Sequence, residues 1–111
     1  MKLSEIKGER VFDVIADVID PIVSIAQDDD AAALFKPQPL PEGMEPWDFF
    51  LQRLRDNLPA LVKAHKDELS LIMATLNEMT VDEYVENLTI PKLIGDLIDL
   101  VTDAEFVSFF N

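Results

Sequence analysis

The stretch from Pro46 to Met79 constrains the fold more than any other part of the chain, because its apolar residues recur at steps of three and four. This spacing places them on one stripe of an α-helix, with polar residues on the other side. The stripe consists of Trp47, Phe50, Leu51, Leu54, Leu58, Leu61, Val62, Leu69, Ile72, Met73 and Leu76. Pro59 and the charged pair Lys66-Asp67 interrupt it, and we expect them to divide it into two helices that fold back as a hairpin.

A second helical pattern begins at Glu9 and has a wide apolar face with aspartates opposite. The apolar face consists of Val11, Phe12, Val14, Ile15, Val18, Ile19, Ile22, Val23 and Ile25. Pro21 lies inside this pattern, and we expect it to kink or split the helix near Asp20, since proline removes a backbone donor.

Capping signals mark shorter helices along the rest of the chain. The Asp28–Asp30 run precedes an alanine-rich segment and predicts an N-cap. Thr80 and Glu83 match a capping box, and Thr102 or Asp103 is expected to begin a last short helix. Between them, residues 90–101 form a further helical pattern, in which Pro91 suits the first turn. In that pattern we expect Gly95 to permit close packing, and Asp96 and Asp99 to point away from the apolar side.

Together these patterns predict an all-α, single compact domain over residues 1–111, with about six to eight short helices around the central helical hairpin. Residues 1–8 form a polar lead-in, which lacks the apolar segment of a signal peptide. Residues 37–45 form a proline-rich connector, whose alternate prolines favour an extended path. No apolar run approaches the roughly 20 residues that cross a bilayer.

The charge balance limits the possible partners. Twenty-two acidic residues against nine basic ones give a formal charge of −13, and a field of that sign repels phosphate backbones and anionic lipids. We therefore expect neither nucleic acid nor a membrane as partner. The charge either keeps the protein soluble, attracts a basic partner, or provides a solubilising coat for an aggregation-prone partner. The sequence leaves these alternatives open. The chain has no cysteine, which excludes disulfides and thiolate sites.

No motif predicts a catalytic, cofactor or metal site, and we expect a non-enzymatic protein. His65, the only histidine, precedes Glu68 by three residues, whereas a di-iron site requires the order Glu-x-x-His twice. We therefore expect a structural or solvent-facing histidine. The Asp28–Asp30 run lacks the glycine and glutamate of a calcium loop, and glycine-rich phosphate loops are absent. A cleft that combines His65 with several carboxylates would instead indicate an enzyme.

The C-terminal aromatic residues are the candidate partner-binding site. Phe106, Phe109 and Phe110 fall within the last six residues, beside Val107. Terminal segments fray unless they are docked, so these side chains either pack on the domain's own core or form a surface for a partner or a second copy.

Four segments resemble a family of tail assembly chaperones from long-tailed phages and prophages of Gram-positive bacteria. They are KLSEIKGERVFDVIADVIDPIVSIAQD, ALFKPQPLPEGMEPWDF, LPALVKAHKDELSLIMATLNEMTVDEYVENL and KLIGDLIDLVTDAEFVSFF, and together they cover nearly the whole chain. The likeness lies in the order of helices and connectors and contains no chemical signature.

The resemblance implies a helical chaperone that binds the tape-measure protein and keeps it soluble in the bacterial host cytoplasm. Tail-tube subunits assemble around that client, and the chaperone is absent from the mature virion. The family often makes a longer product by ribosomal frameshifting, and Phe109-Phe110-Asn111 is compatible with a slippery codon run. The alternative, from another class, is an acidic helical adaptor or inhibitor that sequesters a basic partner protein.

Overall fold

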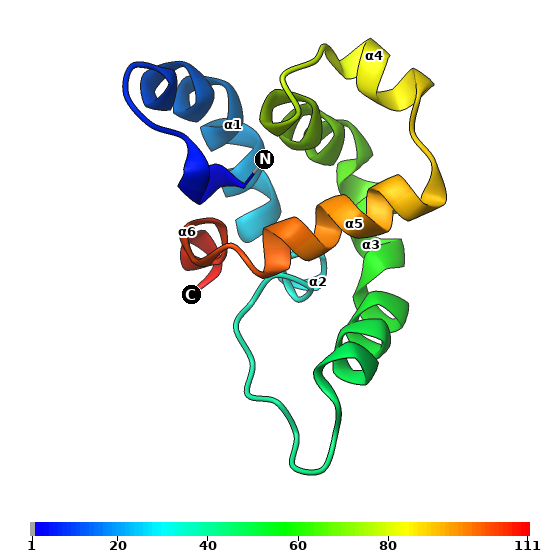
Figure 1. Ribbon diagram of the computed structural model, residues 1–111. Coiled ribbons are helices and arrows are strands. Elements are labelled where there is room, and N and C mark those ends of the chain that lie inside the picture. Colours follow the sequence, from blue (N-terminus) through cyan, green and yellow to red (C-terminus); the bar gives the residue numbers. More distant parts are fainter. Residues whose placement is uncertain (1) are drawn as a thin grey trace.

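The longest element of the computed structural model, which describes residues 2–111, is the bent helix α3, Pro46–Leu76 (Figure 1). Five further α-helices and two 3₁₀ helices surround it. In chain order they are η1 Leu3–Glu5, α1 Arg10–Ala26, α2 Asp29–Ala32, α4 Val81–Glu86, α5 Ile90–Val101, α6 Ala104–Val107 and η2 Ser108–Phe110. The part of the chain that the structure describes contains no strand, and the predicted all-α single domain is confirmed.

The bend in α3 lies at His65, whose φ of −133° and ψ of 27° leave the helical region. One non-helical residue cannot reverse the chain, so the two arms of α3 follow one another without a connecting loop. The predicted hairpin is therefore wrong. A straight helix of 31 residues would be about 46 Å long, whereas the longest dimension of the domain is 43 Å. The bend thus keeps both arms against one core.

Neither internal proline ends its helix, so the expected division at Pro59 and the expected split at Pro21 are both wrong. α3 continues through Pro59, six residues before the bend, and α1 continues through Pro21 as one element. Pro21 is buried and Pro59 is exposed. Helix geometry survives at both positions because the surrounding turns supply the other backbone hydrogen bonds and the apolar stripe continues on both sides of each proline.

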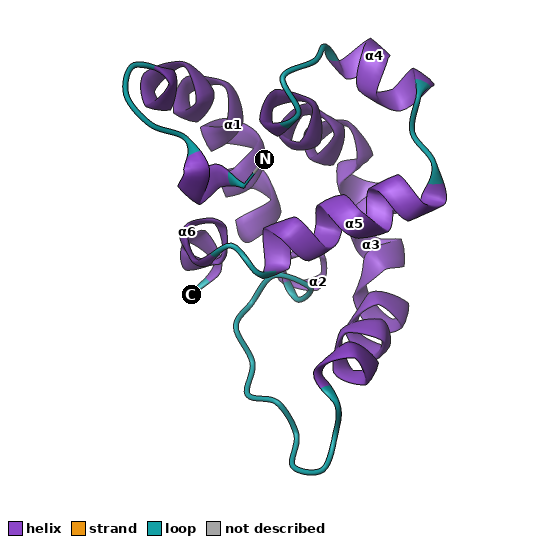
Figure 2. Cartoon of the chain, viewed as in Figure 1, coloured by secondary structure: helices purple, strands orange, loops and turns teal. Residues whose placement is uncertain are grey.

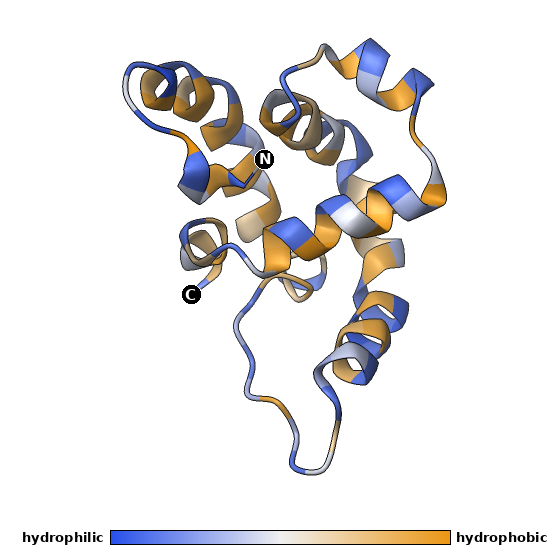
Figure 3. Cartoon of the chain, in the orientation of Figure 1, coloured by the Kyte–Doolittle hydropathy of each residue, from blue (hydrophilic) through white to orange (hydrophobic). Residues whose placement is uncertain are grey.

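The core lies where α1 packs along α3, with α2 beneath and the last helices closing one side (Figures 1 and 3). Its largest fully buried aliphatic side chains are Val18, Ile22, Ile25, Leu34, Leu61, Ile72, Met73, Leu97 and Leu100. They come from α1, α3 and α5 and from the segment after α2. The predicted helical stripes therefore converge on a single apolar cluster.

The predicted caps are confirmed. Asp28 accepts a hydrogen bond from the Ala31 amide at 3.4 Å, and Thr80 and Glu83 form the capping box. Asp103 caps α6 by accepting from the Glu105 amide at 3.1 Å. These contacts fix the helix boundaries, because each satisfies an amide that has no partner within its helix.

Two expectations for α5 are wrong. Asp96 is buried: the Tyr84 hydroxyl donates to its Oδ2 at 2.6 Å, and Lys92 Nζ lies 3.1 Å from its Oδ1. Burial and the Asp96 carboxylate together raise the pKa of Tyr84 well above its usual range. Gly95 does not serve close packing, since no atom lies within 4 Å of the place a Cβ would occupy.

The connector of residues 37–45 is a loop, as expected (Figure 2). Arg53 of α3 holds the segment that leads into this connector. Its Nη2 donates to the carbonyl oxygens of Ala33, Leu34 and Lys36 at 3.0, 2.6 and 2.7 Å. One guanidinium thereby satisfies three carbonyl groups of the segment that follows α2 and joins that segment to the N-terminal arm of α3.

Candidate partner-binding surface

Two of the four predicted partner-binding residues belong to the core. Phe106 and Phe110 are buried and pack with Phe35, which follows α2. The ring centroid of Phe35 lies 5.1 Å from that of Phe106 and 5.1 Å from that of Phe110. The centroids of Phe106 and Phe110 are 5.2 Å apart. These separations are typical of favourable edge-to-face and tilted aromatic contacts.

The predicted binding set is corrected accordingly. Phe106 and Phe110 dock the C-terminal segment on the domain, so their rings are not available at its surface. Val107 is half-buried and packs against the same core. Phe109 is 38% exposed and is the one member of the set that presents a ring to the outside.

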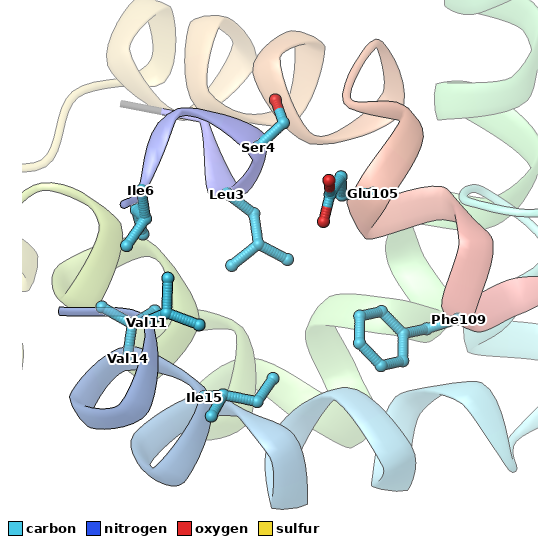
Figure 4. A pocket seen from close by; sticks show the side chains of 8 residues that line it. All are labelled: Leu3, Ser4, Ile6, Val11, Val14, Ile15, Glu105 and Phe109. Atoms are coloured by element: carbon cyan, nitrogen blue, oxygen red, sulfur yellow. The ribbon is translucent and has the colours of Figure 1, made fainter. Parts of the chain in front are cut away.

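Phe109 borders an apolar pocket that sequence reasoning did not identify. This terminal pocket has a volume of about 140 Å³. It is lined by Leu3, Ser4, Ile6, Val11, Val14, Ile15, Glu105 and Phe109. Figure 4 shows apolar side chains of the N-terminal segment, α1 and η2 around one shared space, among them Leu3, Ile15 and Phe109. Segments far apart in the sequence therefore build one hollow.

A buried carboxylate holds the walls of the terminal pocket together. The Ser4 amide donates to Asp103 Oδ2 at 3.1 Å, across 99 residues of sequence. The other oxygen of Asp103 caps α6, so one side chain joins η1 to the helix that carries Glu105. Leu3 and Ile6 also pack against the core. Leu3, Ser4 and Ile6 of the lead-in, which we expected to be polar, thus form one wall of the pocket.

An apolar strip on α1 extends from the pocket. It consists of Phe12, Ile15, Ile19 and Val23, which follow one another at steps of three and four and so share a helix face. Phe12 is 75% exposed, Val23 is also exposed, and Ile15 and Ile19 are half-buried. This α1 strip covers about three turns, roughly 16 Å. The sequence pattern placed Phe12 on the wide apolar face of this helix, whereas the structure leaves that edge of the face exposed.

The other flank of α1 is acidic. Asp13 and Asp17 face a hollow that they share with Glu78 and Glu83, and Asp20 lines a second hollow with Asp67 and Glu68. Arg10 lines the first hollow and pairs with Glu78 at 2.9 Å. α1 thus separates an apolar flank, beside the terminal pocket, from an acidic flank along α3.

Other apolar side chains reach the surface away from this region. Trp47 and Leu51 lie in the first turns of α3, where Trp47 contacts Phe50 at a centroid distance of 5.7 Å. Val85 and Ile90 are exposed at α4 and α5. These side chains do not line the terminal pocket.

His65 is buried and is held on both ring nitrogens by carboxylates. It is 8% exposed; its Nε2 lies 2.8 Å from Asp28 Oδ2, and its Nδ1 lies 2.6 Å from Glu68 Oε1. Two carboxylates therefore converge on the histidine, and they occupy both ring nitrogens. The nearby hollow is lined by Glu68 and Asp20 rather than by the imidazole. The arrangement binds the α2 cap to the bend of α3 and leaves no ring nitrogen free for a substrate.

Within residues 2–111, no group of three or more histidine, aspartate or glutamate side chains is arranged to hold a metal ion. None of the helices in that range is both long enough and apolar enough to span a membrane. Comparisons with protein-family models, curated proteins and solved structures find no match to this chain.

Proposed function

We propose that this protein is a phage tail assembly chaperone that binds the tape-measure protein and keeps it soluble while tail-tube subunits assemble around it. In this proposal it acts in the bacterial host cytoplasm without enzymatic activity or cofactor and is not retained in the virion. The observation that carries the proposal is an exposed apolar pocket and strip on a helical domain of charge −13. An apolar helical client can bind such a surface, while the charge keeps the complex from aggregating.

The physical requirement for such a chaperone is an apolar surface that the free protein can expose without aggregating. The terminal pocket is recessed, and only part of the α1 strip is exposed. Acidic residues on the opposite flank of the same helix keep neighbouring molecules apart. The resemblance of the four sequence segments supplies the identity of the client.

Co-expression tests the proposal. The protein would be produced with the product of any large reading frame found downstream of its gene, and the soluble fraction of that second protein would be measured with and without it. We expect the chain to raise the soluble fraction and to copurify with the client. Unchanged aggregation of the client would reject the proposal. The same gene region shows whether the codons of Phe109, Phe110 and Asn111 form a slippery run with an overlapping frame.

The acidic flank of α1 favours a second candidate, an adaptor or inhibitor that sequesters a basic protein by charge. Asp13, Asp17 and Asp20 line hollows that contain further acids from α3 and α4. Salt separates the two functions, because charge-led binding weakens steeply as salt is raised, whereas apolar binding persists. Retention of the client at about 1 M salt, where the Debye length is roughly 3 Å, would favour the chaperone.

A further inference from the structure

The terminal pocket has the size and lining of a receptor for one large apolar side chain. Its volume is about 140 Å³, and cavities of roughly 150 Å³ lined by aliphatic and aromatic groups hold one benzene ring. The apolar lining consists of Leu3, Ile6, Val11, Val14, Ile15 and Phe109. A phenyl or leucyl side chain that entered it would exchange water for contacts on several sides.

The pocket opens beside a surface that matches a helix. Phe12 lies three residues before Ile15, which lines the pocket, so the α1 strip begins at its edge. The strip runs about three turns along α1. A helix laid along this strip could therefore place one anchor residue in the pocket and keep further apolar residues against Ile19 and Val23.

The negative charge of the protein favours a guest helix that carries basic residues. Glu105 is the charged member of the pocket lining and is exposed, so a cation on the guest would find a partner at the edge of the pocket. The formal charge of −13 makes a second copy of this chain an unfavourable guest, since the two copies would repel each other. A basic helix is attracted by the same field.

We propose that the terminal pocket and the α1 strip together bind one basic amphipathic helix of a partner protein. The guest helix inserts an aromatic or large aliphatic residue into the pocket and sets a lysine or arginine beside Glu105. This inference rests on the proposed function and deepens it, because it specifies the chemistry of the client segment that is held.

Peptide binding tests the inference directly. The probe is a labelled helical peptide of about 18 residues, roughly five turns, with one phenylalanine in a leucine stripe and lysines on both sides of it. Three controls share its length: phenylalanine replaced by alanine, lysines replaced by glutamate, and the same residues scrambled. We expect fluorescence anisotropy to show about tenfold weaker binding of the alanine peptide, the loss typical of a buried anchor. The glutamate and scrambled peptides should bind more weakly still.

Variants of the protein place the binding on this surface. Phe12→Ala and Phe109→Ala should each lower the affinity for the lysine peptide several-fold. Glu105→Lys should also lower the affinity for the lysine peptide, and it should raise the affinity for the glutamate peptide. Ile90→Ala is the matched control, because Ile90 is 80% exposed and lies outside this surface. Circular dichroism would verify that all four variants keep their helices. Equal losses in Ile90→Ala and Phe12→Ala, or equal binding of the scrambled peptide, would overturn the inference.

Two further results separate the inference from the proposed function. Self-association that is abolished by Phe12→Ala, measured by sedimentation velocity, would mean that a second copy occupies the surface and would also overturn the inference. If the co-expressed client stays soluble with Phe12→Ala, Phe109→Ala and Glu105→Lys alike, the chaperone function stands and this binding surface is wrong. If the wild-type protein never solubilises the client but binds the lysine peptide through these residues, the surface stands and the proposed client is wrong.

Discussion

His65 and Asp28, 37 residues apart in the sequence, are joined by a contact of 2.8 Å between Nε2 and Oδ2. The other ring nitrogen lies 2.6 Å from Glu68 Oε1. A neutral imidazole can donate through only one nitrogen, so two ionised carboxylates are both satisfied only by the imidazolium. Burial opposes that charge, but the hydrogen bonds to Asp28 and Glu68 outweigh it and raise the pKa of His65.

The pH dependence of stability follows from these directions. Because the pKa of His65 is raised on folding, its contribution is complete below the unfolded value of about 6.5 and is lost as the pH rises through the folded pKa. The hydrogen bond from His65 lowers the pKa of Asp28. Burial alone would raise the pKa of Glu68, but hydrogen bonds from Ser24 and His65 outweigh burial, so the pKa of Glu68 is lowered as well. Those contributions are present above about pH 4.3 and are lost as the pH falls through the lowered values.

We therefore expect this cluster to stabilise the fold most between about pH 4.5 and 6.5. Urea unfolding of the wild type and of His65→Gln would be compared across pH 4 to 9. The difference in free energy of unfolding between the two proteins should shrink as the pH rises above neutrality. A difference that stays constant from pH 6 to 9 would contradict a charged His65.

The C-terminal rings provide a prediction on stability. Phe106→Ala should lower the free energy of unfolding by about 3–5 kcal/mol, because it opens a cavity among Phe35 and Phe110. Phe109→Ala should lower it by only about 1–2 kcal/mol, because the ring is 38% exposed and less apolar surface leaves water on folding. Chemical unfolding of the two variants measures the contrast. Similar small losses in both would mean that the C-terminal segment is not docked.

The buried pair Tyr84 and Asp96 provides a second prediction on stability. Tyr84→Phe should destabilise the fold by about 1–3 kcal/mol, since it keeps the ring but removes the hydroxyl that donates to a buried carboxylate. Val85→Ala, at an exposed neighbouring position, is the control and should have little effect. If Tyr84→Phe leaves the free energy of unfolding unchanged, Lys92 alone satisfies the Asp96 carboxylate.

Pro59 gives a prediction of opposite sign. It is exposed within the continuous part of α3, where proline costs up to about 3 kcal/mol relative to alanine. Part of that gain is offset because alanine gives the unfolded chain more freedom, so Pro59→Ala should stabilise the fold by about 1–2 kcal/mol. Thermal unfolding would measure the gain. A lower melting temperature would show that Pro59 supports the shape of α3.

Local signals predicted the helices well because they act over three or four residues. The caps at Asp28, Thr80 and Asp103 and the periodic stripes all depend on such short distances. The hairpin was wrong because Pro59 is compatible with a helix whose apolar stripe continues beyond it. The bend lies at His65, next to the predicted break at Lys66-Asp67, where Asp28, distant in sequence, holds the imidazole. It bends α3 without reversing the direction of the chain.

The candidate surface was only partly predictable for the same reason. Phe109 was among the predicted residues, but Phe106 and Phe110 pack on Phe35, a partner that no local pattern indicates. Leu3 and Ile6 line the pocket because the neighbouring Ser4 amide donates to Asp103, which lies at the other end of the chain. Phe12 belonged to the predicted wide apolar face, and the pattern did not show that the core leaves this edge of the face uncovered.

The contact between Ser4 and Asp103 has a consequence for the order of events during synthesis. A growing polypeptide emerges with its N-terminal part first, and Leu3 and Ile6 are made long before Glu105 and Phe109. Because the hydrogen bond spans 99 residues, a nascent chain has one side of the hollow and not the other. The terminal pocket therefore forms only after translation has passed Phe109, because a shorter nascent chain lacks the wall that Glu105 and Phe109 provide.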